Sequence, residues 1–432
     1  MWSKKLASGL AYGMLCTTGI VHADAITDWN EIAQGAIVLP TGRPGPIGVL
    51  DSALIQIAVH DAVQAIDRRY EPYYAEVPGA QGRRSAAAAS AAYGMLTGLY
   101  SAQTQTLEPV YLAYISNHGL NGDPGLEVGA KVAAKILPLA RKNPVPLPPP
   151  FTGGMNPGEW RPTESFIGNP PVPPSGSPMH SPWVANFDPY SLTGPARFLA
   201  DPPPPMTSDH YRRDFEEVKK LGSFASADRT AEQTDIAYFY SDNFLQQWNR
   251  AVRSLVLKHP QRIGDHARLL ALVNIGMADA FITSWNSKVF HNFWRPLTAI
   301  RLADTDDNPD TAPDTNWQPL INTPNYPDYT SGANNLTGAV TRMLRLYYGR
   351  DRFTWEVTSN APLAVKKARI YRRFSEAADD VVEARIWLGI HFRFADVAAR
   401  KQGQQVAEWA FNHVLLPSRD RHDDRDGHDD ND

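Results

Sequence analysis

The chain has 432 residues, of which 43% are apolar and 20% are charged, so it is long and apolar enough to fold around a large core. Its 42 Lys and Arg are balanced by 46 Asp and Glu, which argues against a broad basic surface for nucleic acid. The composition excludes a disordered or fibrous chain and predicts a globular protein of one large domain or two ordinary ones.

The first 23 residues have the features of a bacterial secretory signal peptide. Two lysines precede an apolar stretch from Leu6 to Val21, which is shorter than the roughly 20 residues that span a bilayer. Small residues at positions 21 and 23 predict cleavage before Asp24. No later segment has 18 uninterrupted apolar residues, so we expect a periplasmic or secreted protein without a membrane span.

The single cysteine, Cys16, lies inside this signal, so the mature chain carries no thiol. An exported chain without disulfides is more typical of the bacterial periplasm or medium than of a cysteine-rich scaffold. Thiolate catalysis, iron–sulfur clusters and cysteine–zinc sites are therefore excluded.

Four amphipathic helices are predicted in the first third of the mature chain, because apolar residues recur there at spacings of three and four. They cover Leu50 to Ile66, Ser85 to Tyr100, Leu107 to Ile115 and Val128 to Leu139. Residues 144–205 then hold 19 of the 36 prolines, a density that excludes helix interiors and central strands. We expect a belt packed over the helices, because this segment also has many aromatic residues, among them Trp160, Phe166, Trp183, Phe187, Tyr190 and Phe198.

Helical periodicity returns after the belt, and almost no alternating strand pattern is found. Ser208 can cap a helix that runs to about Leu221. Further helices are predicted over Thr230 to Val256, Arg262 to Arg301, Asn334 to Tyr348, Pro362 to Leu388 and Ala395 to Leu415. The predicted fold class is therefore all-α, a helical bundle with a long Pro-rich irregular belt.

The last fifteen residues, 418–432, hold seven aspartates and no apolar side chain, which predicts a solvated acidic tail. We therefore expect a signal peptide over 1–23, one helical domain over 24–417 and a disordered tail. The belt is taken as part of that single domain rather than as a boundary.

Two cations, Lys288 and Arg295, lie seven residues apart and are predicted on one face of a helix that stops near Pro296. Such a pair is usually solvated. Here the neighbouring residues are aromatic and should be buried: Trp285, Phe290, Phe293 and Trp294. Because a buried cation is costly without a partner, this pair predicts a bound anion.

The segment from Tyr326 to Asn334 ends a proline-bearing loop at the start of a helix, where free N–H groups favour an oxyanion. Ser331 would add a hydroxyl group, and Gly332 would let the anion approach the backbone. An ordinary helix cap by Thr330 or Ser331 is the alternative reading of the same residues.

Arg385 and His391 are six residues apart, which on an unbroken helix would leave them about 120° apart in azimuth. A helix break at Gly389 would let both point at one centre. The alternatives are a core histidine and an ion pair of Arg385 with Asp379 or Glu383. Together, Lys288, Arg295, Ser331, Gly332, Arg385 and His391 predict a site for a tetrahedral oxyanion, which we call the cage.

These residues and their spacing resemble the pattern shared by vanadium-dependent haloperoxidases and type 2 phosphatidic acid phosphatases. The similarity to the bacterial haloperoxidase-like branch extends to Asp28-Trp29-Asn30, to residues 57–63 and 69–72, and to Pro157-Gly158-Glu159-Trp160. It therefore covers most of the mature chain.

The resemblance implies a helical bundle that holds vanadate as cofactor, with phosphate competing for or replacing it. Lys288, Arg295, Ser331, Gly332 and Arg385 would bind its oxygens, and His391 would ligate vanadium. Such an enzyme uses hydrogen peroxide to oxidise a halide. Trp285 and Tyr326 match positions on the halide side of the pocket, although plain core packing would account for them equally.

One position departs from the family, which normally has histidine after Ser-Gly where this chain has Ala333. That histidine is the family's acid–base group, and proton transfer by a placed side chain contributes about 10²- to 10⁴-fold. Peroxidase or phosphatase chemistry is therefore predicted to be impaired. His291 is a candidate substitute, and His60 a further spare histidine with core packing as its more probable role.

Two other functions remain open. An acid phosphatase would use His391 as its nucleophile on a small phosphate ester. That branch usually has a carboxylate four residues after the histidine, whereas position 395 is Ala and Asp396 lies one further on. A non-catalytic oxyanion-binding protein would retain the cage without the proton-transfer group.

Overall fold

The computed structural model describes residues 24–38, 47–142, 150–163 and 178–418, and its described part is mostly helical. The helices are α1 (Ala25–Val38), α2 (Ile47–Asp67), α3 (Arg84–Leu99), α4 (Thr104–Asn117), α5 (Gly125–Ile136), α6 (Leu139–Lys142), α7 (Asp209–Leu221), α8 (Ala231–Phe239), α9 (Phe244–Lys258), α10 (Ile263–His291), α11 (Pro296–Arg301), α12 (Gly332–Tyr347), α13 (Phe374–Trp387) and α14 (Arg393–His413). Short 3-10 turns are η1 (Ser101–Gln103), η2 (Pro182–Asn186) and η3 (Ala303–Thr305).

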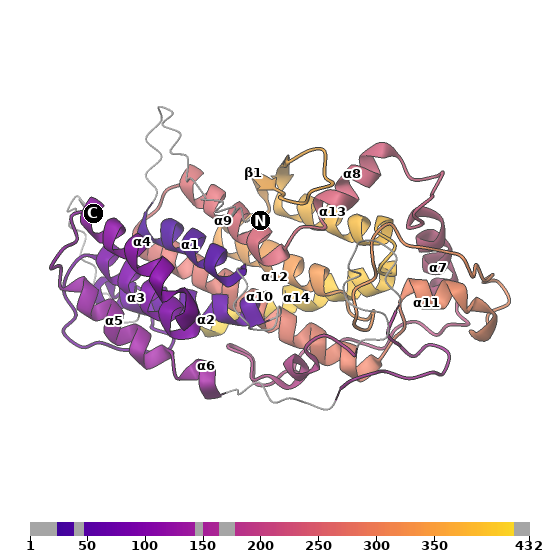
Figure 1. The fold of residues 1–432 in the computed structure, drawn as a ribbon, viewed down its shortest axis with the longest axis horizontal. Helices are drawn as coiled ribbons and strands as arrows, with labels where there is room; N and C mark the ends of the chain where they lie inside the picture. Colours follow the sequence, from indigo (N-terminus) through magenta and orange to yellow (C-terminus); the bar gives the residue numbers. More distant parts are fainter. Residues whose placement is uncertain (1–23, 39–46, 143–149, 164–177, 419–432) are drawn as a thin grey trace, which may run out of the picture.

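The helices form one elongated bundle, in which α1 to α6 lie at one end and α7 and α11 at the other (Figure 1). The long helix α10 lies in the middle and packs against α2, α12 and α14. Its side chains are nearly all buried, the polar ones among them included, as expected of a central helix. By length and hydropathy α2 and α10 would also qualify as membrane spans, but both are buried inside the bundle.

Small residues let α12 and α14 pack with their backbones close together. A Cβ atom added at Gly338 would lie 2.4 Å from the Arg400 carbonyl oxygen, and one added at Gly403 would lie 2.0 Å from that of Asn335. Only glycine fits at either position. This close contact places the first turn of α14 beside the first turn of α12, where the cage residues lie.

The described parts of the Pro-rich belt run along the bundle and are anchored by buried groups. Trp160 is fully buried, and its backbone N–H donates to the Asn292 carbonyl oxygen at 2.7 Å. Asp279 of α10 accepts hydrogen bonds from the Tyr190 N–H, the Ser191 N–H and the Ser191 hydroxyl group at 2.6 to 2.7 Å. Phe166 lies outside the described residues, as do the signal peptide and most of the acidic tail.

The predicted helix from Pro362 to Leu388 is wrong in its first half. Residues 352–373 instead form an antiparallel hairpin of β1 (Arg352–Thr358) and β2 (Ala368–Arg373), and only α13 is helical. The physical reason is visible in β1, where Phe353, Trp355 and Val357 alternate with exposed or half-buried residues.

Two other predicted helices need correction, and one helix was missed. The helix predicted over Thr230 to Val256 is interrupted before Asn243, whose side chain caps α9 by accepting from the Gln246 N–H. The helix predicted over Arg262 to Arg301 is interrupted at residues 292–295. Helix α1 was not predicted at all. The cap at Ser208, whose hydroxyl accepts from the Tyr211 N–H, is confirmed.

Candidate functional site

Lys288 and Arg295 lie on either side of a helix break at residues 292–295 and not on one helix, which corrects the sequence-based expectation. Helix α10 ends at His291 because Asn292 adopts a left-handed conformation, with φ of 47°. Arg295 is the residue before α11, which begins at Pro296. Arg295 nevertheless contacts the Tyr326–Ser331 loop, as Lys288 does.

Both cations are fully buried and donate hydrogen bonds to backbone carbonyl groups, and Arg295 Nη1 also donates to the Ile390 carbonyl oxygen beside His391. Lys288 Nζ donates to the carbonyl oxygens of Pro327 and Asp328 at 2.7 and 3.0 Å. Arg295 Nε donates to the Tyr326 carbonyl oxygen at 2.7 Å. Burial, and then the Arg295 charge, lowers the pKa of Lys288 well below its usual value. An anion bound here would therefore stabilise the charged form of Lys288.

His391 lies in the turn between α13 and α14 and contacts a carboxylate that sequence reasoning missed. Asp328 Oδ1 is 2.7 Å from His391 Nδ1 and 3.7 Å from Arg295 Nη1. Burial raises the pKa of Asp328 to about 7, although Arg295 and Lys288 oppose the shift. Burial, and then the charges of Arg295, Lys288 and Arg385, lowers the pKa of His391 well below its usual value. A neutral imidazole with its Nδ1 held by Asp328 results.

The helix-cap alternative for Thr330 and Ser331 does not describe this structure. Ser331 is the residue before α12, yet its side chain makes no capping hydrogen bond. The Thr330 hydroxyl group donates to Gln402 Oε1 at 2.9 Å instead. A Cβ atom added at Gly332 would lie 3.2 Å from the Trp285 ring, so the glycine lets this ring cover the start of α12.

Arg385 lies in the last turn of α13, and the helix ends just after it, with Gly389 at a φ of 75°. The two acidic residues considered as its partners are engaged elsewhere, since Asp379 pairs with Arg400 and Glu383 with Arg393. Arg385 is 6% exposed, and its Nη1 donates to the Tyr240 carbonyl oxygen at 3.1 Å. Burial lowers its pKa.

Three buried polar atoms of the cage have no hydrogen-bond partner within the described part of the chain: Arg295 Nη2, Ser331 Oγ and Arg385 Nε. Unpaired buried donors are rare and costly, more so when they are charged. An oxyanion is the ligand that offers acceptors to two guanidinium groups and a hydroxyl group at once. The residues present therefore fit a tetrahedral oxyanion.

A second carboxylate that sequence reasoning did not place at the site is Asp396, in the first turn of α14. It is fully buried, and its Oδ1 accepts from Asn334 Nδ2 at 2.8 Å. Burial raises its pKa well above the usual value. Neither Asp328 nor Asp396 stands at the family's expected spacing, so only the folded chain could place them.

The remaining pocket candidates differ in their surroundings. The Tyr326 ring centroid is 4.9 Å from Lys288 Nζ and 4.7 Å from Arg295 Cζ, which is cation–π geometry. Trp285 packs against Tyr326, with 5.0 Å between ring centroids. Ala333 is half-buried in the first turn of α12.

Two histidines considered as substitutes bond to backbone carbonyl groups away from the cage. His291 Nε2 is 2.9 Å from the Ala200 carbonyl oxygen, and burial lowers its pKa. His60 Nε2 is 3.2 Å from that of Glu71, and burial lowers its pKa to about 4. His291 also packs edge-on against Tyr329 in the loop that carries Ser331, with 5.1 Å between ring centroids.

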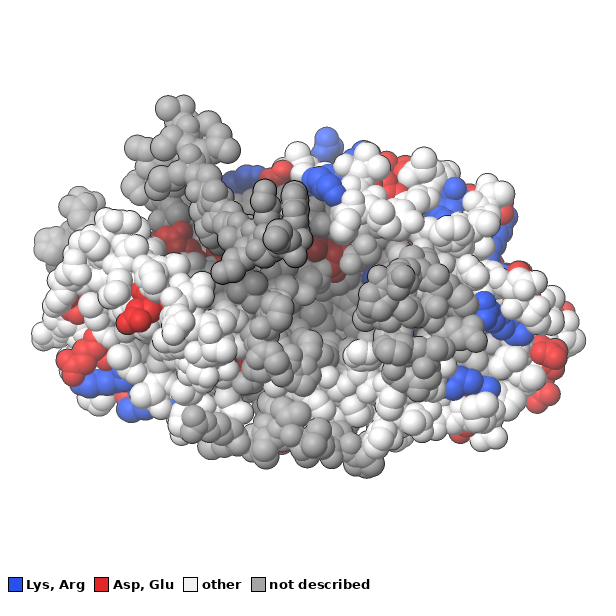
Figure 2. All heavy atoms as spheres, in the orientation of Figure 1, with Lys and Arg blue, Asp and Glu red and all other residues white. Residues whose placement is uncertain are grey.

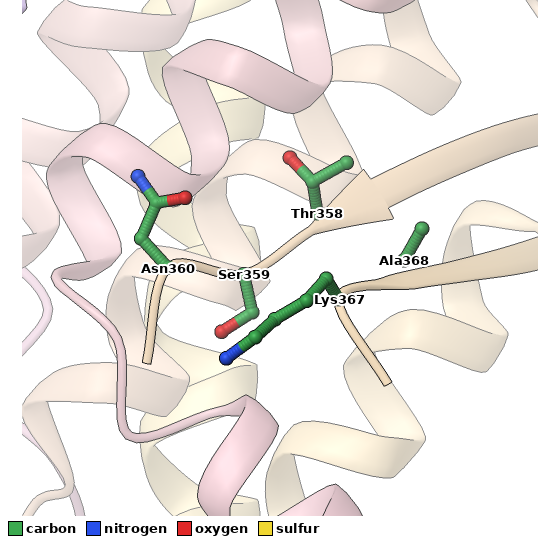
Figure 3. Close-up of a pocket in the computed structure, with 5 residues that line it drawn as sticks. All are labelled: Thr358, Ser359, Asn360, Lys367 and Ala368. Carbon is green, nitrogen blue, oxygen red and sulfur yellow. The ribbon is translucent and has the colours of Figure 1, made fainter. Parts of the chain in front are cut away.

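Charged side chains of both signs are scattered over the face shown in Figure 2 and do not gather into one patch. A hollow at the end of the hairpin is lined by Thr358, Ser359, Asn360, Lys367 and Ala368 (Figure 3). Its polar groups hold the fold together, because Lys367 Nζ donates to the Ala361 carbonyl oxygen and Ser359 Oγ to that of Phe239. The cage is therefore the stronger functional candidate.

Comparison with known proteins gives matches in sequence. Residues 268–418 match a family model described as the VCPO second helical-bundle domain. Over 298 residues the chain is 26% identical to the vanadium chloroperoxidase of Curvularia inaequalis, and this match covers 53% of the chain. It covers 49% of the relative, so the chain spans about half the length of the protein it matches.

Solved structures of bacterial proteins share the fold over most of the chain. A bacterial vanadium-dependent iodoperoxidase has a TM-score of 0.77 at 21% identity, covering 91% of this chain and 98% of its own. The holo form of a bacterial vanadium-dependent chloroperoxidase has a TM-score of 0.72 at 16% identity, covering 90% and 96%. The mostly helical fold class predicted from sequence is thus confirmed.

Proposed function

Because the chain belongs to the superfamily of vanadium-dependent haloperoxidases and type 2 phosphatidic acid phosphatases, we propose that it binds vanadate in the cage and oxidises a halide with hydrogen peroxide. The observation that carries this proposal is the set of unpaired buried donors on Arg295, Ser331 and Arg385. Phosphate, which has the same tetrahedral shape and charge, would compete for this site.

The charged and the uncharged residues of the cage would bind vanadate in different ways. Lys288, Arg295 and Arg385 supply positive charge in a buried environment, where charge–charge interactions are stronger than in water. Ser331 and the first N–H groups of α12 supply uncharged donors. Vanadate bound there would activate hydrogen peroxide toward attack by a halide.

His391 would bind vanadium through Nε2. A nitrogen ligand must be unprotonated, and burial with three nearby cations keeps the His391 pKa low. Asp328 at 2.7 Å holds Nδ1 and so fixes the ring orientation. This pairing supports a ligand role more than ordinary core packing.

An acid phosphatase is the second candidate, and the same Asp328 contact favours it. The carboxylate that would orient a nucleophilic histidine is absent at position 395, but Asp328 contacts His391 Nδ1 from another loop. His391 Nε2 could then attack the phosphorus of a bound phosphate ester. Both functions use one cage, so they must be separated by assay.

Export of the chain is a further proposal, and the start of α1 supports it. Asp24 Oδ1 accepts from the N–H groups of Ile26 and Thr27 at 3.1 and 3.0 Å and so caps α1. Asp24 Oδ2 also contacts His266 Nδ1 of α10. Cleavage before Asp24 would therefore leave the capped helix intact.

A side-by-side assay tests the two enzymatic functions. Protein without residues 1–23 is freed of phosphate, divided, and assayed with and without added vanadate. We expect vanadate-dependent bromination of a dye with peroxide, and its loss in His391→Ala. Hydrolysis of nitrophenyl phosphate that is inhibited by vanadate, without bromination, would favour the phosphatase instead.

A further inference from the structure

The carboxyl group of Asp396 lies beside the cage, and only one of its oxygens accepts a hydrogen bond from the described residues. Asp396 Oδ1 accepts from Asn334 Nδ2, but Asp396 Oδ2 has no hydrogen-bond partner among the described residues. Asn334 Oδ1 is likewise unpaired and buried. Ser331 Oγ is near enough to favour the charged form of Asp396, although the two make no hydrogen bond of good geometry.

Charged groups from four parts of the fold face Asp396. Its charge acts on Lys288 of α10, on Arg295 before α11 and on Arg385 of α13, and raises the pKa of each. Asp328, from the Tyr326–Ser331 loop, acts on Asp396 in turn and raises its pKa. The backbone places Asp396 beside Ser331 of the cage, because the Ser331 N–H donates to the Ala395 carbonyl oxygen at 3.2 Å.

The unpaired polar atoms around Asp396 include both hydrogen-bond donors and hydrogen-bond acceptors. Arg295 Nη2 and Arg385 Nε can only donate, whereas Asp396 Oδ2 and Asn334 Oδ1 need a donor while the carboxyl group is ionised. A fully deprotonated oxyanion satisfies the guanidinium groups but leaves these two oxygens unpaired and is repelled by a carboxylate. A single proton between the carboxyl group and the oxyanion pairs Asp396 Oδ2 and removes the repulsion between the two anions.

We propose that Asp396 touches the bound oxyanion and exchanges a proton with it, so that it is the proton-transfer residue of the cage. In one direction the O–H bond of the Asp396 carboxyl group breaks and an O–H bond forms on an oxygen of the oxyanion. The carboxylate left behind accepts a hydrogen bond from that hydroxyl group. This inference rests on the oxyanion site of the proposed function.

Burial supports this role, because it raises the pKa of Asp396 and so favours the protonated carboxyl group. The position also fits, since Asn334 follows Ala333 on α12 and holds Asp396 at the start of this helix. Asp396 would thus act on the ligand from α14, close to the residue where the family's histidine would stand.

Sulfate is the probe for this proposal, because it keeps one protonation state across the neutral range. Its affinity for the wild-type protein is measured by calorimetry between about pH 5 and pH 9, the range in which a carboxyl group of raised pKa ionises. Ionisation of Asp396 removes a donor and adds a negative charge. We therefore expect the affinity to fall as pH rises, by about tenfold per pH unit above the pKa.

Asp396→Asn is the test variant, because asparagine keeps the size and a donor but carries no ionisable proton. Its sulfate affinity should lose the part of the pH dependence that Asp396 contributes, should keep the part due to Asp328 and Lys288, and should exceed that of the wild type at the alkaline end. Asp396→Ser serves as a second variant if the first fails to fold. The matched control is Asp214→Asn, since Asp214 is also buried and accepts from the Phe394 N–H of the same helical turn, outside the cage.

The outcomes separate this inference from the proposed function. Equal pH dependence in the wild type and both Asp396 variants, or a flat profile in the wild type, would overturn the role of Asp396 while leaving the oxyanion site in place. If neither sulfate, phosphate nor vanadate binds the wild-type protein at any pH, the oxyanion site itself fails. Loss of the pH dependence in Asp214→Asn as well would also count against Asp396.

Discussion

Oxyanion binding should stabilise the folded chain, and removal of one cage arginine should reduce this stabilisation by a predictable amount. A ligand at 100 times its Kd raises the free energy of unfolding by about 2.7 kcal/mol. Each guanidinium group contributes charge-assisted hydrogen bonds, worth about 1.5–3 kcal/mol, from an atom that has no partner among the described residues. Arg295→Ala or Arg385→Ala should therefore weaken binding by about 10- to 150-fold.

At the same ligand concentration the stabilisation then falls to about 1.4 kcal/mol for a tenfold loss and about 0.3 kcal/mol for a 150-fold loss. Thermal unfolding of the phosphate-free protein, with and without vanadate or phosphate, measures this directly. The Tm should rise with either anion in the wild type and rise far less in both variants. Arg400→Ala is the control, because Arg400 pairs with Asp379 outside the cage and its loss should leave the rise intact. An undiminished rise in both cage variants would refute the reasoning, since the anion would then bind elsewhere.

Other predictions follow from individual contacts. Ala333→His should increase the rate of chloride oxidation more than that of bromide oxidation, by up to about 10²-fold if the imidazole is well placed. Steady-state rates with the two halides test this prediction. An unchanged ratio of the two rates in a folded variant would contradict it. Gly403→Ala should lower the free energy of unfolding by about 1–3 kcal/mol, because the new Cβ would lie 2.0 Å from the Asn335 carbonyl oxygen. Gly35→Ala is the control and should not be destabilising, because the space around Gly35 is open. Denaturant titration compares the stability of the two variants. Asp279→Ala leaves three donors of Tyr190 and Ser191 without their acceptor, at about 1–3 kcal/mol for each one left unpaired. The belt near Tyr190 should then be cleaved faster by a protease, and equal cleavage rates would show that this anchor is unimportant.

Most helices could be predicted from the sequence, because they have an apolar stripe along one face or are apolar along most of their length. Sequence patterns failed at the hairpin, where the alternation of Phe353, Trp355 and Val357 in β1 covers only seven residues. They also failed at residues 292–295, because periodicity alone does not show that Asn292 turns left-handed.

The cage residues could be grouped from sequence because their spacing follows a known pattern. The two carboxylates could not. Asp328 lies within a segment that was singled out, but its contact with His391 joins residues 63 positions apart. Asp396 reaches Asn334 only because Gly338 and Gly403 let α12 and α14 pack closely. Contacts of this kind depend on tertiary packing and have no local pattern.

Crystallographic analysis of the protein soaked with vanadate tests the central claim most directly. We expect vanadium bonded to His391 Nε2, with its oxygens within about 3 Å of Arg295 Nη2, Ser331 Oγ and Arg385 Nε. His391→Ala should lose the vanadium–nitrogen bond while the three donors still face one centre. Vanadate bound elsewhere, or a cage that stays empty at saturating vanadate, would contradict the account.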